Sequence, residues 1–505
     1  MIYTRNEITD DIYEKADACI IGSGAGGAVM AKELSEAGLE VVLLEEGGYF
    51  KNSDFTGDPV EMTKLLYRSS GSVMSIGIPP IMIPLGRCIG GTTVINSGTC
   101  FRTPDGVLKH WQREFGLESI TNEELTPFFE RVENIVNAIP TTEELLGGSG
   151  LRVKKGAEAL GYRGSPLLRN VRDCRGCGIC VFGCPTNAKQ AMHVTYIPAA
   201  SKNGARIYAN CRAERLISEN GRAAGIEGSF LDADEKAFRK ITVKSKITIL
   251  SCGAIFTPAF LLKNRIGRKN NHLGRHLHLH PATRVMAMFD EPIMGWKGVP
   301  QSFYIDEFER LGIMLEGFFV PPSIAAVTLP FAGMRHKEIM SRYSRIAGFG
   351  VMVSDTTEGR VRMDRKGNPL ITYWLNKEDT EKAVKGIALL SEVFLAAGAK
   401  EIYTGLVDIP VITSQKEIGN LYKMEIKPSH LELMAFHPMG TLRMGADPKV
   451  SVIDEHCELR EVKNLFVADA SIFPSSLGVN PQISIMAFST YLADYLIKTR
   501  VKYFC

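Results

Sequence analysis

The first residues whose types and spacing could do chemistry are a run of glycines near the start of the chain and an acid that follows them. The glycine turn has the pattern G-x-G-x-x-G and consists of Gly22, Gly24, Ala25, Gly26 and Gly27. This spacing permits a tight turn, a close approach of a pyrophosphate to the backbone, and close packing of a helix on a strand. Glu45 lies at the distance expected for a carboxylate that binds ribose hydroxyls and disfavours a 2′-phosphate. These residues predict FAD or NAD as the ligand, and the alternative is a βαβ unit with a structural role alone.

Four cysteines between residues 174 and 184 form a second group with recognisable spacing. They are separated by two, two and three residues, and the last precedes Pro185. This is the spacing with which bacterial ferredoxins hold iron–sulfur clusters. The alternatives are a structural zinc site formed by the same thiols, or cysteines that bind no metal. Four ligands close a [4Fe-4S] cluster and three hold a [3Fe-4S] cluster. We expect the former, with the ligands Cys174, Cys177, Cys180 and Cys184.

A second glycine turn, GRCIGGTTVIN, occupies residues 86–96. Taken alone it could be an ordinary loop between strands. Together with the first turn it resembles the first signature of the glucose-methanol-choline (GMC) oxidoreductase family, in which this segment lines the flavin. The resemblance therefore selects FAD over NAD. It implies cofactor contacts from Gly86, Arg87, Gly90, Gly91 and Asn96.

Later segments carry the same resemblance. The motif SCGA at 251–254 is similar to a second flavin-contacting motif of the family, and the backbone near Ala213 is similar to the segment that meets adenine. The stretches FHPMGTLRMG at 436–445 and LFVADASIFPSSLGVNPQISIMA at 465–487 are similar to the last two flavin segments. From these the resemblance implies further cofactor contacts by Gly253, Asp469, Asn480 and Pro481.

In the family a histidine stands beside the flavin opposite a second polar residue, and the matching positions here are His437 and Asn480. Oxidising an alcohol by hydride transfer leaves positive charge on carbon unless the hydroxyl proton departs, so a base speeds the step by a typical ~10²–10⁴-fold. We expect His437 to be that base. Asn480 is expected to hydrogen-bond the substrate oxygen.

The cysteine run suggests how the electrons leave. A hydride carries two electrons, whereas many external carriers accept one at a time, so a one-electron relay would divide the pair. The resemblance thus implies an FAD- and iron–sulfur-dependent alcohol dehydrogenase acting on CH–OH groups, with a cytochrome, a quinone or a ferredoxin-like carrier as external acceptor. The alternatives are an oxygen-using alcohol oxidase with a structural metal site, a non-redox lyase that keeps FAD as a scaffold, and a subunit whose main role is assembly with a partner.

The substrate class stays divided between two branches of the family. Asn at position 480 resembles the branch of sterol oxidases and long-chain alcohol oxidases. The cysteine run resembles the bacterial iron–sulfur sugar and polyol dehydrogenases, which match Cys174, Cys180 and Cys184 and lack the fourth thiol. A primary or secondary alcohol is expected in either case.

The elements that must position these residues indicate an α/β protein. Buried strands are expected at 18–21, 41–44 and 247–250, a hairpin turn at Asn220-Gly221, and a capping box from Thr121 to Glu124. Beyond residue 281 the pattern changes to alternating strands, such as 283–289 and 348–353, and a helix at 378–397. We expect a Rossmann-like FAD-binding domain from 1–104, 203–275 and 436–505. An α+β substrate domain with an antiparallel sheet would comprise 105–202, including the segment 174–185, and 276–435.

Two further stretches leave their roles open. His276, His278 and His280 alternate in HLHLHP and would share one strand face, where a structural role is expected before a zinc site. The apolar stretch 317–334 is interrupted by prolines and would be core, the wall of a substrate tunnel, or a membrane-resting surface.

Composition excludes several classes of protein. With 505 residues and a net charge of +3, the chain has room for two or three domains and no basic stripe for nucleic acid. No stretch approaches the roughly 18 apolar residues of a membrane span. The first 15 residues have no apolar core, so a signal peptide is not expected, and eleven cysteines suit a reducing interior. We expect a cytoplasmic location, with peripheral membrane association and an additional subunit as open alternatives.

Overall fold

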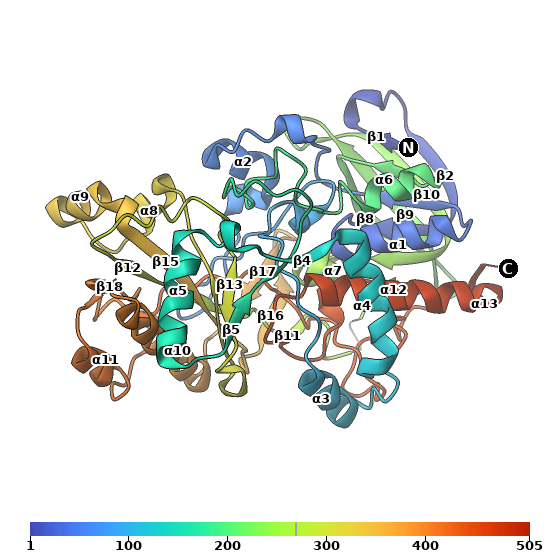
Figure 1. Cartoon of the computed structure of the whole chain (residues 1–505). Helices are drawn as coiled ribbons and strands as arrows, with labels where there is room; N and C mark the ends of the chain where they lie inside the picture. Colours follow the sequence, from blue (N-terminus) through green and yellow to red (C-terminus); the bar gives the residue numbers. More distant parts are fainter. Residues whose placement is uncertain (268–269, 505) are drawn as a thin grey trace.

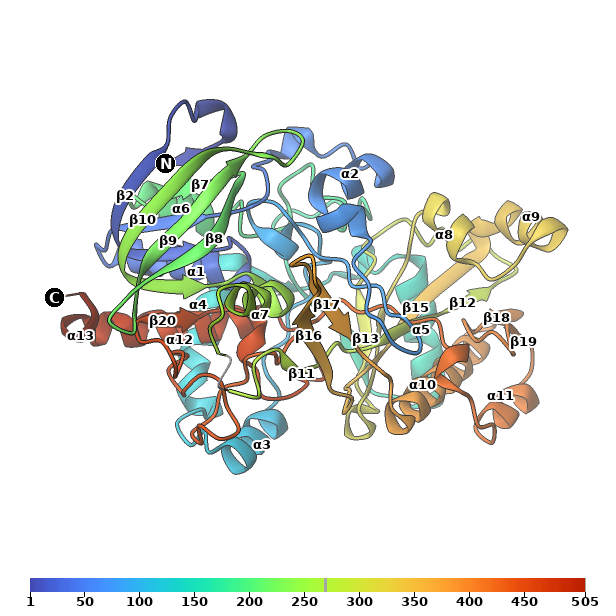
Figure 2. The same cartoon turned by 180° about the vertical axis from the view of Figure 1, so that it is seen from behind.

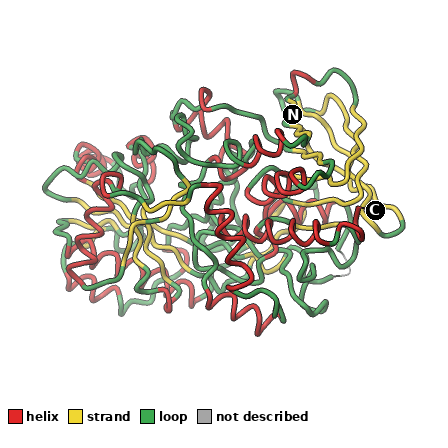
Figure 3. The backbone as a smooth tube through the Cα atoms, turned by 45° about the vertical axis from the view of Figure 1, so that its right-hand side comes forward, coloured by secondary structure: helices red, strands yellow, loops and turns green. Residues whose placement is uncertain are grey.

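Two sheets at opposite ends of the molecule organise the computed structural model, which describes residues 1–267 and 270–504. Figures 1 and 2 show the larger sheet near both chain ends and the second sheet at the far side of the molecule. We call them the large sheet and the cap sheet. In Figure 3 both chain ends lie beside strands of the large sheet. The α/β architecture with a second, antiparallel sheet that the sequence predicts is confirmed.

The large sheet contains eight strands within the described residues, in the order β1-β7-β3-β2-β10-β9-β8, with β20 also paired to β10. They are β1 (Ile2–Tyr3), β2 (Ile12–Ile21), β3 (Val41–Leu44), β7 (Arg206–Tyr208), β8 (Cys211–Glu219), β9 (Arg222–Leu231), β10 (Ala237–Leu250) and β20 (Leu465–Val467). The strands β2, β3, β7, β10 and β20 pair in parallel, whereas β8, β9 and β10 pair antiparallel. Mixed pairing of this kind lets a hairpin extend a Rossmann-type core.

The strands of the large sheet follow the sequence pattern closely. The four residues 18–21 and the four of β3 are all buried, as continuous apolar runs in a parallel sheet require. The expected hairpin turn is confirmed: β8 ends at Glu219, β9 begins at Arg222, and Asn220 and Gly221 between them both have positive φ. The strand β2 begins earlier than expected, because residues 12–16 also pair with β10 although they alternate in burial.

Helices cover the large sheet and connect it to the middle of the molecule. The helix α12 (Gln482–Lys498) packs on α1 (Ala25–Glu36) and α4 (Asn122–Val136), and α13 (Arg500–Phe504) contacts β10. The remaining helices of this half are α2 (Pro59–Leu66), α3 (Asp105–Phe115), α6 (Tyr196–Lys202) and α7 (Gly253–Lys263). Thr121 caps α4 by accepting a hydrogen bond from the Glu124 amide at 3.1 Å, which is one of the two hydrogen bonds of the expected capping box.

The cap sheet is antiparallel and has the order β19-β18-β12-β15-β14-β13-β5 within the described residues. Its strands are β5 (Gly164–Pro166), β12 (Ala282–Met288), β13 (Phe303–Ile305), β14 (Ile313–Gly317), β15 (Ile346–Val353), β18 (Glu401–Tyr403) and β19 (Val411–Ile412). One face packs on α10 (Lys377–Ala396) and α5 (Gly147–Leu160), with α11 (Gln415–Leu421) beyond α10. The expected strands and long helix of this region are present.

Two small sheets join the halves. They are the three-stranded sheet of β11 (Arg275–Leu277), β16 (Gly359–Met363) and β17 (Pro369–Thr372), and the pair β4 (Ala138–Pro140) and β6 (Leu168–Asn170). The apolar stretch 317–334 contains α8 (Pro322–Thr328), with α9 (Gly333–Ser341) next to it. Its residues Phe319 and Leu329 are buried in one cluster with Met286 and Met288 of the cap sheet, so part of this stretch is core.

The segment HLHLHP does not form the regular strand that the alternating pattern predicts. Strand β11 ends at Leu277, and His276 and His280 have φ of 59° and 50°. A positive φ breaks the alternation of side chains between two faces. The expectation that the three imidazoles share one face is therefore wrong, and each contacts a different partner.

Candidate active site

The first glycine turn stands where β2 ends and α1 begins. Gly22 has φ of 96°, and a Cβ atom there would lie 2.3 Å from the carbonyl oxygen of Ser251. A Cβ at Gly27 would lie 1.9 Å from the carbonyl oxygen of Gly22, and one at Gly26 would lie 1.7 Å from that of Ala468. Gly24 has no neighbouring atom within 4 Å of such a position, so its outer side is open. The turn is thus closed on the protein side and open where a ligand would approach.

The second glycine turn packs against the first. Gly90 and Gly91 both have positive φ, and a Cβ at Gly91 would lie 2.9 Å from the Cα of Gly24. The amide of Gly90 donates to Oγ of Ser23 at 3.0 Å, and a Cβ at Gly86 would lie 2.6 Å from the carbonyl carbon of Gly91. Residues predicted from two distant motifs are therefore neighbours.

Glu45 joins these turns at the end of β3. Its carboxylate accepts hydrogen bonds from the amide and hydroxyl of Ser23, at 3.0 and 2.7 Å, and from the amide of Gly47 at 2.8 Å. Burial raises the pKa of Glu45, while these hydrogen bonds oppose that rise. The acid expected to bind ribose is held rigidly beside the glycine turn.

Asp469 ties the C-terminal segment to the first turn of α7. Its carboxylate accepts from the amide of Gly253 at 2.9 Å and from the amide of Ser471 at 2.8 Å. Burial raises the pKa of Asp469, against the hydrogen bonds that it accepts from Ser471 and Thr257. No heavy atom lies within 4 Å of a Cβ position at Gly253, so this backbone also borders open space.

The other expected cofactor residues occupy varied positions. Asn96 donates from Nδ2 to Oε1 of Gln482 at 2.8 Å, which connects the second turn to the start of α12 next to Pro481. Arg87 forms ion pairs with Glu46 and Glu235, and Ala213 is half-buried on β8.

The region around the two glycine turns has the features that FAD binding requires. The amide groups at the start of α1 have no side-chain cap, the outer sides of Gly24 and Gly253 are open, and the two glycine turns meet at one place. An elongated ligand with a pyrophosphate suits such a cradle, because uncapped amides at a helix start attract phosphate. The residues present therefore fit FAD.

The candidate catalytic pair lies where the C-terminal segments meet the cap sheet. Nε2 of His437 is 3.3 Å from Nδ2 of Asn480, and the Asn480 side chain is buried with no recorded partner for Oδ1 among the described residues. Burial and the neighbouring His280 hold the pKa of His437 well below its usual range. The imidazole is therefore neutral at ordinary pH. The two residues that the sequence expects to act together are in contact.

A small cavity adjoins this pair. It has a volume of about 50 Å³, and His437, His280 and Glu316 line it together with Thr283, Arg284, Gln301 and Glu432. Apolar side chains of the cap sheet and its neighbours form most of the remaining wall: Phe318, Val351, Met352, Met434 and Phe436.

Glu316 was not predicted, yet it reaches the pair from strand β14 of the cap sheet. Its side chain is 7% exposed, and Oε1 lies 3.5 Å from Nδ2 of Asn480. Burial raises the pKa of Glu316 to about 7, which the hydrogen bond from Asn480 partly opposes. The only sequence signal is an acid inside the apolar strand Ile-Met-Leu-Glu-Gly.

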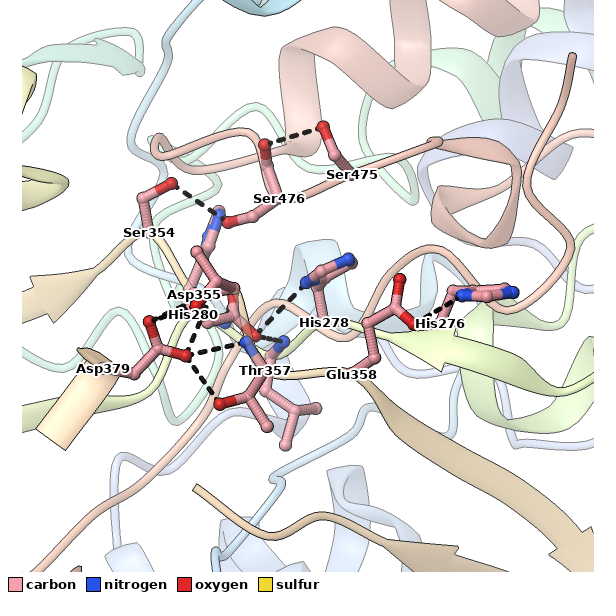
Figure 4. A network of polar contacts seen from close by, with 12 residues as sticks. His276, His278, His280, Ser354, Asp355, Thr357, Glu358, Asp379, Ser475 and Ser476 are labelled. Atoms are coloured by element: carbon pink, nitrogen blue, oxygen red, sulfur yellow. Dashed lines mark hydrogen bonds and ion pairs between the residues drawn. The ribbon is translucent and has the colours of Figure 1, made fainter. Parts of the chain in front are cut away.

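A polar network, shown in Figure 4, holds the loop that carries His280. Asp355 accepts from the amides of Leu279 and His280, at 2.9 and 3.2 Å, and from the hydroxyl of Tyr373 at 2.8 Å. Burial alone would raise the pKa of Asp355, but the nearby His278 and the hydrogen bond from the Leu279 amide hold it well below its usual range. Asp355, like Glu316, was not predicted from the sequence.

The three histidines of this segment have separate partners. Nδ1 of His276 is 2.7 Å from Glu358, Nδ1 of His278 is 3.6 Å from Asp355, and Nδ1 of His280 is 3.2 Å from Nδ1 of His437. In Figure 4 His276 and His278 point to different acids. Each therefore serves a different local contact.

The cysteine run is an irregular loop that lies against two buried cations. The guanidinium of Arg169 is 3.3 Å from Sγ of Cys180 and 3.9 Å from Sγ of Cys174, and the amide of Lys189 donates to Sγ of Cys184 at 3.4 Å. Burial raises the pKa of the Cys184 thiol, but the hydrogen bonds from Lys189 and Thr186 outweigh it and lower the pKa overall.

Cys177 is exposed. Within residues 1–267 and 270–504, no three or more His, Cys, Asp and Glu side chains are grouped so that they could hold a metal ion. As placed, the thiols do not form a ligand set.

The fold and the paired glycine turns define a dinucleotide-binding oxidoreductase of the Rossmann type. Two models of the GMC oxidoreductase family match residues 63–282 and 355–489, and a model of the NAD(P)-binding Rossmann-like domain matches residues 20–57. The GMC-type oxidoreductase Rv0492c of Mycobacterium tuberculosis is 37% identical over 485 residues, which cover 96% of this chain and 76% of the relative. The chain belongs to the GMC oxidoreductase family and is an FAD-dependent oxidoreductase.

More distant relatives and solved structures agree in fold. The long-chain-alcohol oxidase FAO4B of Arabidopsis thaliana is 29% identical over 527 residues, covering 98% of this chain and 69% of the relative. The crystal structure of pyridoxine 4-oxidase from Mesorbium loti superposes with a TM-score of 0.72 at 17% identity, covering 95% of this chain and 98% of that one. A structure of formate oxidase gives 0.72 at 15% identity, with 98% and 100% covered.

No helix in the described part of the chain is long and apolar enough to cross a membrane.

Proposed function

We propose that this protein oxidises a primary or secondary alcohol to a carbonyl compound with FAD as its cofactor. The observation that carries the proposal is that Asn480 contacts both His437 and Glu316, and that these two residues line a cavity whose wall is mainly apolar. When bound, FAD supplies the acceptor for a hydride. The chain supplies polar groups that orient a hydroxyl and receive its proton.

The apolar wall favours an alcohol with a hydrocarbon chain over a sugar. Phe318, Met352, Met434 and Phe436 offer no hydrogen bonds to a second hydroxyl group from their side chains, and they make up more of the wall than its polar side chains do. Those polar side chains, besides His437, His280 and Glu316, are Thr283, Arg284, Gln301 and Glu432. The relative named long-chain-alcohol oxidase supports the same choice, although it is only 29% identical. A sugar or polyol is the second candidate, and it rests on the cysteine spacing alone.

The test is an anaerobic panel of alcohols monitored by bleaching of the flavin absorbance. We expect medium- and long-chain primary alcohols to bleach the flavin faster than glucose or sorbitol. Bleaching by sugars alone would replace the proposed substrate class. Failure of every alcohol to bleach a flavin that dithionite reduces would overturn the proposed function and favour the lyase alternative.

For the cysteine run we propose an iron–sulfur cluster that passes electrons to an external one-electron carrier. The spacing supports it, as do Arg169 and Lys189, whose recorded partners among the described residues are backbone carbonyls and thiols, with no carboxylate. Two buried cations without carboxylates suit an anionic group of sulfur ligands. The exposed position of Cys177 and the absence of a grouped ligand set among the described residues speak against it.

Analysis of iron and acid-labile sulfide, with electron paramagnetic resonance, tests the cluster directly. We expect about four iron atoms per chain if all four thiols bind, and three if Cys177 does not. A protein with stoichiometric zinc or no metal would overturn the proposal. Peroxide formation that matches substrate turnover would then favour an oxygen-using oxidase, the activity for which several relatives are named.

A further inference from the structure

We propose that Glu316 receives the hydroxyl proton and that His437 donates a hydrogen bond to the substrate oxygen. The inference rests on the proposed function and reassigns the base that the sequence leads one to expect. It follows from the positions of hydrogen atoms in a chain of contacts that runs from Gly478 through His280 to His437.

The contact of His280 with Gly478 determines which ring nitrogen of His280 carries the hydrogen. The amide of Gly478 donates to Nε2 of His280 at 2.9 Å. A backbone N–H can only donate, so Nε2 must be the ring nitrogen without hydrogen. Burial lowers the pKa of His280 to about 4, so the ring is neutral and its one hydrogen is on Nδ1.

The contact between His280 and His437 in turn determines which ring nitrogen of His437 carries a hydrogen. Nδ1 of His280 lies 3.2 Å from Nδ1 of His437. Since His280 donates at this contact, Nδ1 of His437 accepts, and the hydrogen of the neutral His437 ring is on Nε2. A protonated Nε2 has no lone pair to receive a proton from the substrate. Nε2 of His437 is therefore a hydrogen-bond donor, and it lies next to Asn480.

Nε2 of His437 lies next to a second hydrogen-bond donor, the side-chain amide of Asn480. Nε2 of His437 and Nδ2 of Asn480 are 3.3 Å apart, and in this tautomer both atoms carry hydrogen. Neither group can accept from the other. An oxygen placed between them would accept from both, as an alcohol oxygen does with increasing strength while it becomes an alkoxide. The pair therefore forms a two-donor site for the reacting oxygen.

The proton of the substrate hydroxyl needs an acceptor other than His437, and a carboxylate at the cavity can supply it. Two carboxylates border the cavity, and Glu432 is exposed and paired with Arg284 at 2.9 Å. Glu316 is buried, and its Oε2 atom has no hydrogen-bond partner among the described residues. It is thus the carboxylate placed to take a proton inside the cavity. Its pKa of about 7 suits a group that gains and loses a proton near neutral pH.

The reaction balances with these roles. The alcohol loses a hydride from carbon, which the cofactor accepts, and a proton from oxygen, which the Glu316 carboxylate accepts. The alcohol becomes a carbonyl compound, and Glu316 becomes a carboxylic acid that must release the proton to solvent before the next turnover. His437 keeps its hydrogen throughout.

The groups that face Glu316 come from several elements. His280 and His437 are neutral, Asn480 donates to it, and Tyr304 on β13 is its neighbour across the strands. Arg284 and Glu432, which form an ion pair, also line the cavity. The pH dependence of alcohol oxidation is therefore expected to follow Glu316, with rates that rise with pH through about 7.

The experiment compares E316Q, H437Q and H437A with the wild type by anaerobic stopped-flow reduction of the bound flavin across a range of pH. We expect E316Q to reduce flavin about 100-fold more slowly and to lose the rise near pH 7, with FAD content unchanged. The Gln amide of H437Q keeps a donor near Nε2, so H437Q should be faster than H437A. E381Q, at an exposed position on α10, is the matched control and should behave as wild type.

Two outcomes would overturn the inference while leaving the proposed function intact. One is an active wild type with E316Q within a few-fold of it and an unchanged pH profile. The other is equal inactivity of H437Q and H437A beside an active E316Q, which would make His437 the base. A substrate-free readout is independent of both: infrared difference spectra should show a carboxylic acid that titrates near pH 7 and is absent from E316Q. Its presence in E316Q would also overturn the assignment.

Discussion

Gly91 packs directly against Gly24, so that a Cβ atom at Gly91 would lie 2.9 Å from the Cα atom of Gly24. The two glycines belong to different motifs, yet their backbones touch at the cradle proposed for the pyrophosphate end of FAD. A side chain at Gly91 would press on Gly24, whereas a side chain at Gly24 would point into open space. The contact therefore sets how closely the first and second glycine turns approach each other.

Gly91→Ala should lower FAD binding. Gly91 has φ of 55°, a region that costs an L-residue about 1–2 kcal/mol, and the new methyl group would press on Gly24. We expect roughly a tenfold loss of FAD affinity, measured from the ratio of flavin to protein absorbance after gel filtration. Gly419→Ala is the control, because Gly419 lies in α11 with no atom within 4 Å of its Cβ position. Equal FAD content in the two variants would contradict the packing argument.

His437→Ala should slow flavin reduction by alcohol while FAD stays bound. Removing one donor to a developing oxyanion costs about 10²–10³-fold in rate. The measurement is anaerobic bleaching at saturating alcohol. His430→Ala is a matched control away from the cavity, where the half-buried His430 pairs with Asp408. Rates for His437→Ala close to wild type would remove His437 from the reaction.

Replacing His280 separates its two contacts. In H280N the side-chain amide can still donate toward His437, whereas in H280Q the longer side chain can still accept from the Gly478 amide without donating to His437. If the contact to His437 sets the hydrogen position, H280N should keep more activity than H280Q. The ring nitrogen signals of ¹⁵N-labelled His437 should shift only in variants that lose the donor. The reverse order of activities would show that the Gly478 contact matters more.

Asp355→Asn should destabilise the protein by about 2–4 kcal/mol, because a buried anion with several donors is replaced by an amide that satisfies them poorly. Since the pKa of Asp355 is lowered in the folded state, its contribution is present above the unfolded pKa of about 3.8 and is lost as pH falls below it. Urea denaturation at pH 7 and in acid measures both effects. The difference between wild type and D355N should shrink in acid, and a constant difference would contradict the linkage.

The sequence predicted the parts of this structure that depend on local spacing. The run 18–21 and the four residues of β3 were predicted because parallel strands are continuous apolar runs, and the turn at Asn220-Gly221 because both residues accept positive φ. The contact of His437 with Asn480 was expected only through the family resemblance. Their separation along the chain leaves no local signal.

The residues that the sequence did not reveal are acids whose importance depends on tertiary contacts. Glu316 is one acid in an apolar strand, and Asp355 follows a strand end as many surface acids do. Only folding buries both and places them beside His437 and His280. The HLHLHP prediction was wrong for a related reason: positive φ at His276 and His280, with Asp355 bonded to the amides of Leu279 and His280, overrides the alternation of a strand.

Because Glu316 belongs to strand β14, it stands on the same sheet as Val351 and Met352, which shape the cavity wall. Exchanging that sheet for the equivalent part of a relative would replace the pocket's contour and its ionisable carboxyl group in a single step. Chimeras that are designed to accept a broader range of alcohols should therefore also have a shifted pH optimum for alcohol oxidation. Transplanting single wall residues would leave that optimum where it is.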